Sequence, residues 1–217
     1  MRLSPRILVT GFSLYNGYLY NPTTQIVEDL NGTVINGILI EGMVLPVSFR
    51  RAIPMLKSVL EERKPAIVLG LGFAPSASQV VLELAAANLA FFQIPDADGY
   101  KAEGEEIEHE NELVVEARLP VKKIIDSCIK AQRLPLVPSV SIGTYLCNAV
   151  GYTVMSYAAR YGAIGGFLHI PPTTDIAMRL NIRTSIPYRE VFESVLCVLK
   201  TCVDHAADIG ILSTREG

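Results

Sequence analysis

The sequence predicts a three-layer α/β/α domain with a mixed, mostly parallel sheet. Short runs rich in Val, Ile and Leu alternate with segments of helical periodicity along the chain. Half of the 217 residues are hydrophobic and 19% are charged, so a sizeable core can be buried. No internal repeat or linker-like segment interrupts this alternation. We therefore expect residues 1–217 to form a single domain.

Three apolar runs have the length and residue types of buried strands. Residues 7–12 and 66–70 each lead into a glycine-containing loop, and residues 165–170 end at a Pro-Pro pair. We expect a further strand over residues 137–142. The Asn-Gly pair within residues 34–40 predicts a tight hairpin turn.

Five segments have apolar residues at helical spacing. We expect helices over residues 22–30, 49–63, 121–133, 147–161 and 188–207. The first helix has Asn21 as its N-cap and Pro22 at its first position. Periodicity does not decide between helix and strand for residues 80–94. The acidic stretch 103–116 predicts a solvated loop or hairpin.

Charge and hydropathy exclude several kinds of partner. The net charge is -3, so the chain has no basic field for nucleic acid. Its longest apolar runs are interrupted well before the ~20 residues that a membrane-spanning helix needs. Residues 1–6 lead directly into a strand-like run without the apolar region of a signal peptide. We therefore expect no nucleic-acid or membrane partner, and a cytoplasmic location.

The four cysteines form no Cys-x-x-Cys pair. Cys128, Cys197 and Cys202 lie in helical patterns rich in Ile, Val and Leu, so we expect small buried hydrophobic residues without disulfide bonds. The three histidines are not clustered with other ligands. This spacing predicts no structural zinc site.

Cys147 is placed differently, at the start of an expected helix after a Gly-Thr turn. Backbone N–H groups at a helix N-terminus stabilise a thiolate and a developing oxyanion, which favours a nucleophile over a structural thiol. A cysteine phosphatase also places its thiol at such a junction, but it needs an arginine about six residues later. Position 153 is threonine, and the next arginine is Arg160, so the phosphatase interpretation is poor.

His169 is the histidine best placed to act as a base for Cys147. It ends an apolar run, where its ring can face a cleft, although a lone histidine there can also be a core residue. His109 and His205 are expected at the surface. Glu83 is an isolated ionisable group in a long apolar stretch, so it needs a partner. It can orient His169, contact a substrate N–H, or form a structural ion pair.

Several motifs occur in the order and spacing that is typical of pyroglutamyl peptidases, which remove N-terminal pyroglutamate from peptides. The most specific are Gly-Thr-Tyr-Leu-Cys-Asn at 143–148 and Gly-Phe-Leu-His-Ile-Pro at 166–171. The others are Thr-Gly-Phe at 10–12, Asn-Pro at 21–22, Glu-x-x-Ala-x-Asn at 83–88 and Ile-Pro-Asp-x-x-Gly at 94–99. The chain thus resembles this family over residues 7–171, and its last helix also fits.

The resemblance implies a phosphorylase/hydrolase-like α/β fold and a cysteine peptidase without metal or cofactor. Cys147 would form an acyl-enzyme, His169 would act as the base, and Glu83 would orient the imidazole. The matching substrate-binding positions are Phe12, Tyr15, Asn21, Phe73, Tyr145 and Leu146. The family also implies peptides with N-terminal pyroglutamate as partners and a homo-oligomer, either a tetramer or a dimer.

Two loops depart from the usual pattern of the family. In the first loop Leu14 replaces a proline and Asn16 replaces a glycine. In the loop after the second long strand, Phe73 stands at a usual glutamine position and Ala77 at a usual arginine position. Two alternatives therefore stay open. One is a thiol hydrolase of another small cyclic amide or blocked N-terminus, and the other is a ligand-binding relative without turnover.

Overall fold

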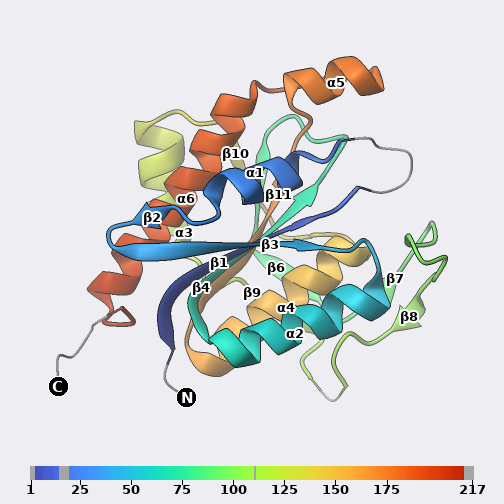
Figure 1. The fold of residues 1–217 in the computed structure, drawn as a ribbon, viewed down its shortest axis with the longest axis horizontal. Coiled ribbons are helices and arrows are strands. Elements are labelled where there is room, and N and C mark those ends of the chain that lie inside the picture. Colours follow the sequence, from blue (N-terminus) through green and yellow to red (C-terminus); the bar gives the residue numbers. More distant parts are fainter. Residues whose placement is uncertain (1–2, 15–19, 110, 213–217) are drawn as a thin grey trace.

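A central seven-stranded sheet organises the chain. The computed structural model describes residues 3–14, 20–109 and 111–212 (Figure 1). The sheet strands are β1 (Ser4–Phe12), β2 (Val34–Ile35), β3 (Ile38–Leu45), β4 (Pro65–Phe73), β5 (Val80–Glu83), β10 (Leu136–Ser139) and β11 (Ile164–Ile170). Their order across the sheet is β10-β5-β11-β4-β1-β3-β2. Only the β2/β3 and β5/β11 pairs are antiparallel in this described sheet, so the prediction of a mixed, mostly parallel sheet is confirmed.

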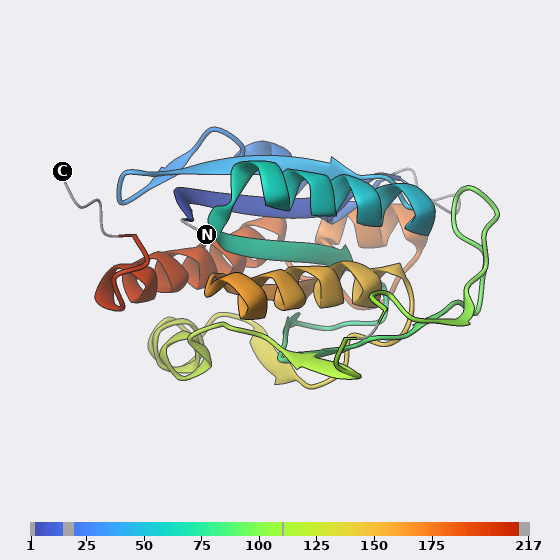
Figure 2. The same ribbon diagram turned by 90° about the horizontal axis from the view of Figure 1, so that it is seen from below.

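Helices cover both faces of the sheet, which confirms the predicted three layers (Figures 1 and 2). One face carries α2 (Phe49–Arg63) and α4 (Leu146–Tyr161), which lie side by side. The other carries α1 (Pro22–Leu30), α3 (Val121–Ile124) with its continuation η1 (Ile125–Ala131), and α6 (Tyr188–Asp208). A further helix, α5 (Thr174–Leu180), follows β11 and was not predicted.

The alternation of side chains along each strand divides the core into two clusters. In β1, Ile7 and Val9 pack with α1 and α6, whereas Leu8 and Phe12 pack on the side of α2 and α4. Glycines in β4 and β11 let α4 approach closely. A Cβ at Gly165, for example, would lie 2.7 Å from the Cβ of Ala158. The predicted strands at 7–12, 66–70 and 165–170 and the hairpin at 34–40 are confirmed.

The ambiguous segment 80–94 forms strands. After β5 the chain continues as β6 (Ala85–Ala87) and β7 (Ala90–Phe91), which pair with two strands of the acidic stretch. These are β9 (Val114–Glu116), which pairs with β6, and β8 (Glu103–Glu105), which pairs with β7. Most of the described acidic residues of this stretch are exposed as expected, but the Glu108 side chain is only 12% exposed. Of the two expected forms, a loop or a hairpin, the hairpin is wrong, because β8 and β9 each pair with an earlier strand.

Two other elements differ from their predicted form. The helix expected over residues 121–133 starts as α3 and widens into the π-helix η1. The strand expected over residues 137–142 is β10, which ends at Ser139. β10 lies at an edge of the sheet, where Pro138 is tolerated because one side of the strand needs no partner.

The prediction for two of the cysteines is wrong. Cys128 in η1 and Cys197 in α6 are buried as expected, but they form a disulfide across 69 residues of sequence. The sequence pattern places each cysteine on an apolar helix face, and only the packing of η1 against α6 brings the two together. Cys202 is a free, buried cysteine, as predicted.

Among the described residues, no helix combines the length and apolar character that crossing a membrane would require.

Candidate active site

The carboxyl ends of three parallel strands meet at one edge of the sheet. Phe12, Phe73 and Ile170 end β1, β4 and β11, whose carboxyl ends point the same way. His169 lies opposite Gly72 in β4, one residue before the end of its strand. On its other side β11 pairs with β5, where Glu83 faces Phe167. The side chains of His169 and Glu83 therefore emerge from neighbouring strands.

His169 and Glu83 contact each other directly. The Nδ1 of His169 lies 2.7 Å from Oε1 of Glu83, and the two side chains are only 13% and 3% exposed. The other carboxylate oxygen, Oε2, is buried and has no hydrogen-bond partner among the described residues. A buried carboxylate with one partner is stabilised when that partner is positively charged, which couples Glu83 to the protonation of His169.

Cys147 reaches the same place from α4. It is the second residue of the helix, after the cap residue Tyr145, and it is partly exposed. Its Sγ packs over β4, since a Cβ on Gly72 would lie only 2.7 Å away. His169 lies opposite Gly72 in the sheet, so the sulfur and the imidazole are neighbours, and Cys147 raises the pKa of the ring. His169 thus connects a thiol at a helix N-terminus with a buried carboxylate.

These neighbours determine the charge of the imidazole. Burial alone would lower the pKa of His169, because it disfavours the charged ring. The hydrogen bonds to Cys147 and Glu83, together with the negative charge of the thiolate and the carboxylate, outweigh burial and raise the pKa of His169 to about 9. At neutral pH the His169 ring is therefore held in its charged form, beside the sulfur of Cys147.

A cavity of about 260 Å³ opens beside the sulfur of Cys147. Its wall is largely apolar and comes from several loops: Phe12, Ser13, Tyr20, Asn21, Val47, Phe73, Pro75, Ile94, Tyr145, Leu146 and Cys147. Five of the six predicted substrate-binding residues are in this wall: Phe12, Asn21, Phe73, Tyr145 and Leu146. The sixth, Tyr15, lies outside the described residues.

The cavity wall is held by contacts within its own loops. Asn21 caps α1 by accepting a hydrogen bond from the backbone N–H of Thr23, and its Nδ2 donates to the carbonyl oxygen of Ser13. The hydroxyl of Tyr145 donates to the carbonyl oxygen of Pro95 at 3.2 Å. Arg179 lies over the ring of Tyr20 and donates to its hydroxyl at 2.7 Å. The wall is thus braced by polar contacts that lie around the cavity.

Sequence reasoning missed Asp96 as a structural part of this site. Its buried carboxylate accepts hydrogen bonds from the backbone N–H groups of Phe49, Asp98 and Tyr100. It therefore caps α2 from a distant loop and ties the segment of Ile94 to that of Val47. The Asp-Ala-Asp-Gly turn at 96–99 is the local signal that could have indicated such a role.

The other histidines lie elsewhere. His109 is exposed, as predicted, but His205 is only partly exposed and its Nδ1 is buried. Within residues 3–14, 20–109 and 111–212, no three His, Cys, Asp or Glu side chains are grouped to hold a metal ion.

Comparison with known proteins identifies the family. Residues 5–205 match the family model described as Pyroglutamyl peptidase. The chain belongs to the pyroglutamyl peptidase family. Among related proteins, the pyrrolidone-carboxylate peptidase of Thermococcus litoralis is 40% identical over 172 residues, which cover 78% of each chain. That of Pyrococcus furiosus is 34% identical over 205 residues, covering 94% of this chain and 98% of the relative.

The three-dimensional comparison agrees with this family. The solved structure of the pyrrolidone carboxyl peptidase from Thermococcus litoralis matches with a TM-score of 0.88 at 34% identity, over 94% of this chain and 96% of that one. A Pyrococcus furiosus structure, Pf-PCP(1-204)-C, also matches with a TM-score of 0.88, at 33% identity. The expected α/β fold of the pyroglutamyl peptidases is therefore confirmed for this chain.

Proposed function

We propose that this protein is a cysteine peptidase that removes N-terminal pyroglutamate from peptides. The observation that carries the proposal is the position of His169, which lies opposite Gly72 beneath the Cys147 sulfur and has its Nδ1 2.7 Å from Oε1 of Glu83. This arrangement lies beside an apolar cavity at the carboxyl edge of the sheet, in a chain that matches the pyroglutamyl peptidase family over residues 5–205.

The reaction starts from the ion pair of Cys147 and His169. The thiolate attacks the carbonyl carbon that follows the pyroglutamyl ring, and the carbonyl oxygen becomes an oxyanion. In the first turn of α4, the N–H groups of Asn148 and Ala149 already donate to the carbonyl oxygen of Tyr145, so those of Leu146 and Cys147 are the candidate donors to that oxyanion. His169 then gives its proton to the leaving amine, the C–N bond breaks, and a thioester to Cys147 remains.

The second half of the reaction uses the same groups in the opposite direction. His169, now neutral, takes a proton from a water molecule that attacks the thioester carbon. Pyroglutamate leaves, and the proton stays on His169 beside the regenerated thiolate. Glu83 accepts from the Nδ1–H of His169, so the Nε2 is the nitrogen that serves the sulfur and the water.

The cavity suits a small, compact acyl group. Phe12, Phe73 and Leu146 present apolar surface to a ring whose carbon atoms gain from leaving water. The volume of about 260 Å³ also limits how much of the substrate enters. The remaining peptide would extend from Cys147 toward solvent, as an enzyme acting at a chain end requires.

Hydrolysis of a pyroglutamyl chromogenic amide tests the proposal. We expect turnover by the natural chain and its loss in Cys147→Ser and in His169→Ala. Alanyl and prolyl amides serve as controls. Alanine has no ring, and the ring of proline lacks the lactam carbonyl. Product release by Cys147→Ser at the natural rate would contradict the mechanism. Turnover of other blocked or cyclic amides with no cleavage of the pyroglutamyl amide would favour a thiol hydrolase of different specificity.

The single-domain organisation, the homo-oligomeric state and the location belong to the same proposal. Large apolar side chains such as Val140 and Met178 are 75% and 80% exposed in the isolated chain, which supports a tetramer or dimer. Light scattering of the purified protein measures this state, and a monomer would contradict it.

A cytoplasmic location has one consequence for the disulfide. The Cys128–Cys197 bond would then have to persist inside the cell, as intracellular disulfides do in hyperthermophiles.

A further inference from the structure

The three residues of the proposed reaction are positioned in two different ways. His169 and Glu83 lie on neighbouring strands, so the hydrogen bonds of β5 and β11 determine their separation. Cys147 comes from α4, which is outside the sheet. Its sulfur reaches the imidazole only if the first turn of α4 is held against the sheet layer.

Asn148, the next residue, makes that connection. Its Nδ2 donates to the carbonyl oxygens of Ala87 and Leu89 at 2.8 and 2.9 Å. Its Oδ1 accepts from the backbone N–H of Ala87 at 3.0 Å. The segment that Asn148 contacts begins only four residues after Glu83, so one carboxamide joins the nucleophile's helix to the chain that leads from the carboxylate.

The carboxamide of Asn148 has no N–H donor left for a substrate. Both of its N–H donors are used, its oxygen has a partner, and the residue is completely buried. It therefore cannot serve as an oxyanion donor without breaking a bond inside the protein. Any effect it has on the reaction passes through the position of Cys147.

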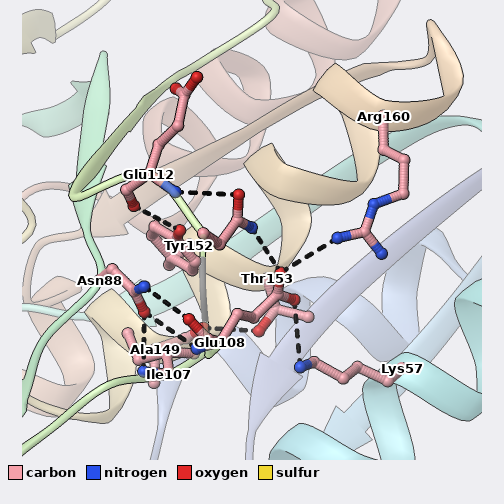
Figure 3. Close-up of polar contacts among 10 residues, drawn as sticks. Lys57, Asn88, Ile107, Glu108, Glu112, Ala149, Tyr152, Thr153 and Arg160 are labelled. Atoms are coloured by element: carbon pink, nitrogen blue, oxygen red, sulfur yellow. Dashed lines mark hydrogen bonds and ion pairs between the residues drawn. The ribbon is translucent and has the colours of Figure 1, made fainter.

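A second buried asparagine holds the same segment from its other side. The Oδ1 of Asn88 accepts from the backbone N–H groups of Ile107 and Glu108, and its Nδ2 donates to the carbonyl oxygen of Glu108 (Figure 3). Glu108 in turn pairs with Lys57 and Arg160 (Figure 3). Asn88 thus has as many hydrogen bonds as Asn148, but they lead into the acidic stretch and away from the sulfur.

We propose that Asn148 is a positioning residue that fixes the sulfur of Cys147 relative to His169 and Glu83. This inference rests on the proposed function, because it assumes that Cys147 is the nucleophile. The comparison with Asn88 separates positioning from stability. Each of the two side chains stabilises the fold through three hydrogen bonds. Only Asn148 lies in the helical turn that carries the Cys147 thiol.

The experiment compares Asn148→Ala with the matched control Asn88→Ala. Titration with iodoacetamide counts the reactive thiols, because Cys202 is buried and the other two cysteines are bonded to each other. The rate of pyroglutamyl amide hydrolysis is then divided by the number of Cys147 thiols titrated in molecules whose Cys202 stays unreacted, because Cys202 reacts only in unfolded protein. The second readout is the rate of alkylation of Cys147 at neutral pH, which needs no substrate.

We expect Asn148→Ala to lose roughly 10- to 100-fold in kcat per titrated thiol, with KM changed less, as for a reacting group displaced by about 1 Å. Its alkylation should slow toward that of a free thiol. Asn88→Ala should lose thermal stability and keep kcat per thiol within about twofold. If Asn148→Ala does not fold, Asn148→Asp gives the same comparison, because it keeps the size and the bond to the Ala87 N–H and loses both donors.

Equal kcat per thiol and equal alkylation rates in the Asn148 variants and the natural chain would overturn the inference. So would an equal loss in Asn88→Ala, because the effect would then belong to the segment and not to the turn of Cys147. If the natural chain does not cleave the pyroglutamyl amide, the proposed function fails. The alkylation rates still decide whether Asn148 positions the thiol.

Discussion

His169 carries a charge that burial alone would oppose. The ring is largely enclosed, yet its pKa is raised to about 9 because the Cys147 and Glu83 side chains bond to it and are negative when the site is charged. A raised pKa means that the folded state holds the proton more tightly than the unfolded state, whose histidine has a pKa near 6.5. The resulting stabilisation is complete below about pH 6.5 and is lost as the pH rises through about 9.

The alkaline limb of the pH–rate profile should report this proton. We expect kcat/KM of the natural chain to hold to near pH 9 and to fall above it, as His169 loses its proton. Glu83→Gln removes one of the negative neighbours, so the limb should move to lower pH. The Glu83→Gln substitution should also lower kcat by roughly 100-fold or more, since the imidazole loses its orienting partner. An alkaline limb at the same pH in both proteins would show that Glu83 does not act on His169.

Position 72 requires a glycine, because the sulfur of Cys147 lies next to the place where a Cβ would be. A Cβ there would lie 2.7 Å from the Sγ of Cys147 and 2.8 Å from the ring of Phe167, which is completely buried. We expect Gly72→Ala to lower the free energy of unfolding by about 1–3 kcal/mol and to abolish most activity, because the thiol must move.

The control for this variant is Gly32→Ala. Gly32 has a positive φ of 79° and open space around its Cβ position, far from the sulfur in the sequence and on the turn after α1. We expect a loss of about 1 kcal/mol in unfolding free energy from the strained backbone, with kcat unchanged. Urea denaturation and the pyroglutamyl amide assay measure both effects. Full activity of Gly72→Ala would contradict the packing of Cys147 over β4.

At the scale of elements, the disulfide joins the π-helical segment η1 to the 21-residue helix α6. Cys128 lies in the π-helical η1 and Cys197 in α6. The pairing closes a loop of 69 residues, which restricts the unfolded chain. The bond lies in the cluster on the α1 and α6 side, whereas Phe167 and Leu146, which surround the thiol, belong to the other cluster.

Replacing both cysteines with serine tests this element. We expect the unfolding free energy to fall by about 2–4 kcal/mol, while kcat per titrated thiol stays unchanged because the bond lies on the opposite face of the sheet. Reductant should lower the Tm of the natural chain and leave the Tm of the double variant unchanged. A reductant-insensitive Tm in the natural chain would contradict the disulfide.

The helices and strands differ in how well the sequence predicts them. Helices with their own end signals, such as α1 with Asn21 and Pro22, are found close to their bounds. The segment 80–94 contains no such signal, and it forms strands because β11 and the acidic stretch supply partners far along the chain. The Cys128–Cys197 bond depends on the same kind of distant packing.

For the whole molecule, the sheet brings distant parts of the chain to one edge. Phe12, Cys147 and His169 are far apart in the sequence, and the sheet brings them together where β1, β4 and β11 end. The bond between His169 and Glu83 follows from an antiparallel register that no local pattern indicates. Val47 and Ile94 enter the cavity wall through the Asp96 contacts, which likewise join segments remote in sequence.

The central claim is that the Cys147 thiolate, paired with His169, takes the pyroglutamyl group. Mass spectrometry of the enzyme quenched in acid during turnover of a pyroglutamyl ester measures this directly. We expect the mass to rise by one pyroglutamyl group, located on the proteolytic fragment that contains Cys147, and no such rise in Cys147→Ser. Turnover without an adduct on that fragment, or an equal adduct in Cys147→Ser, would contradict the account.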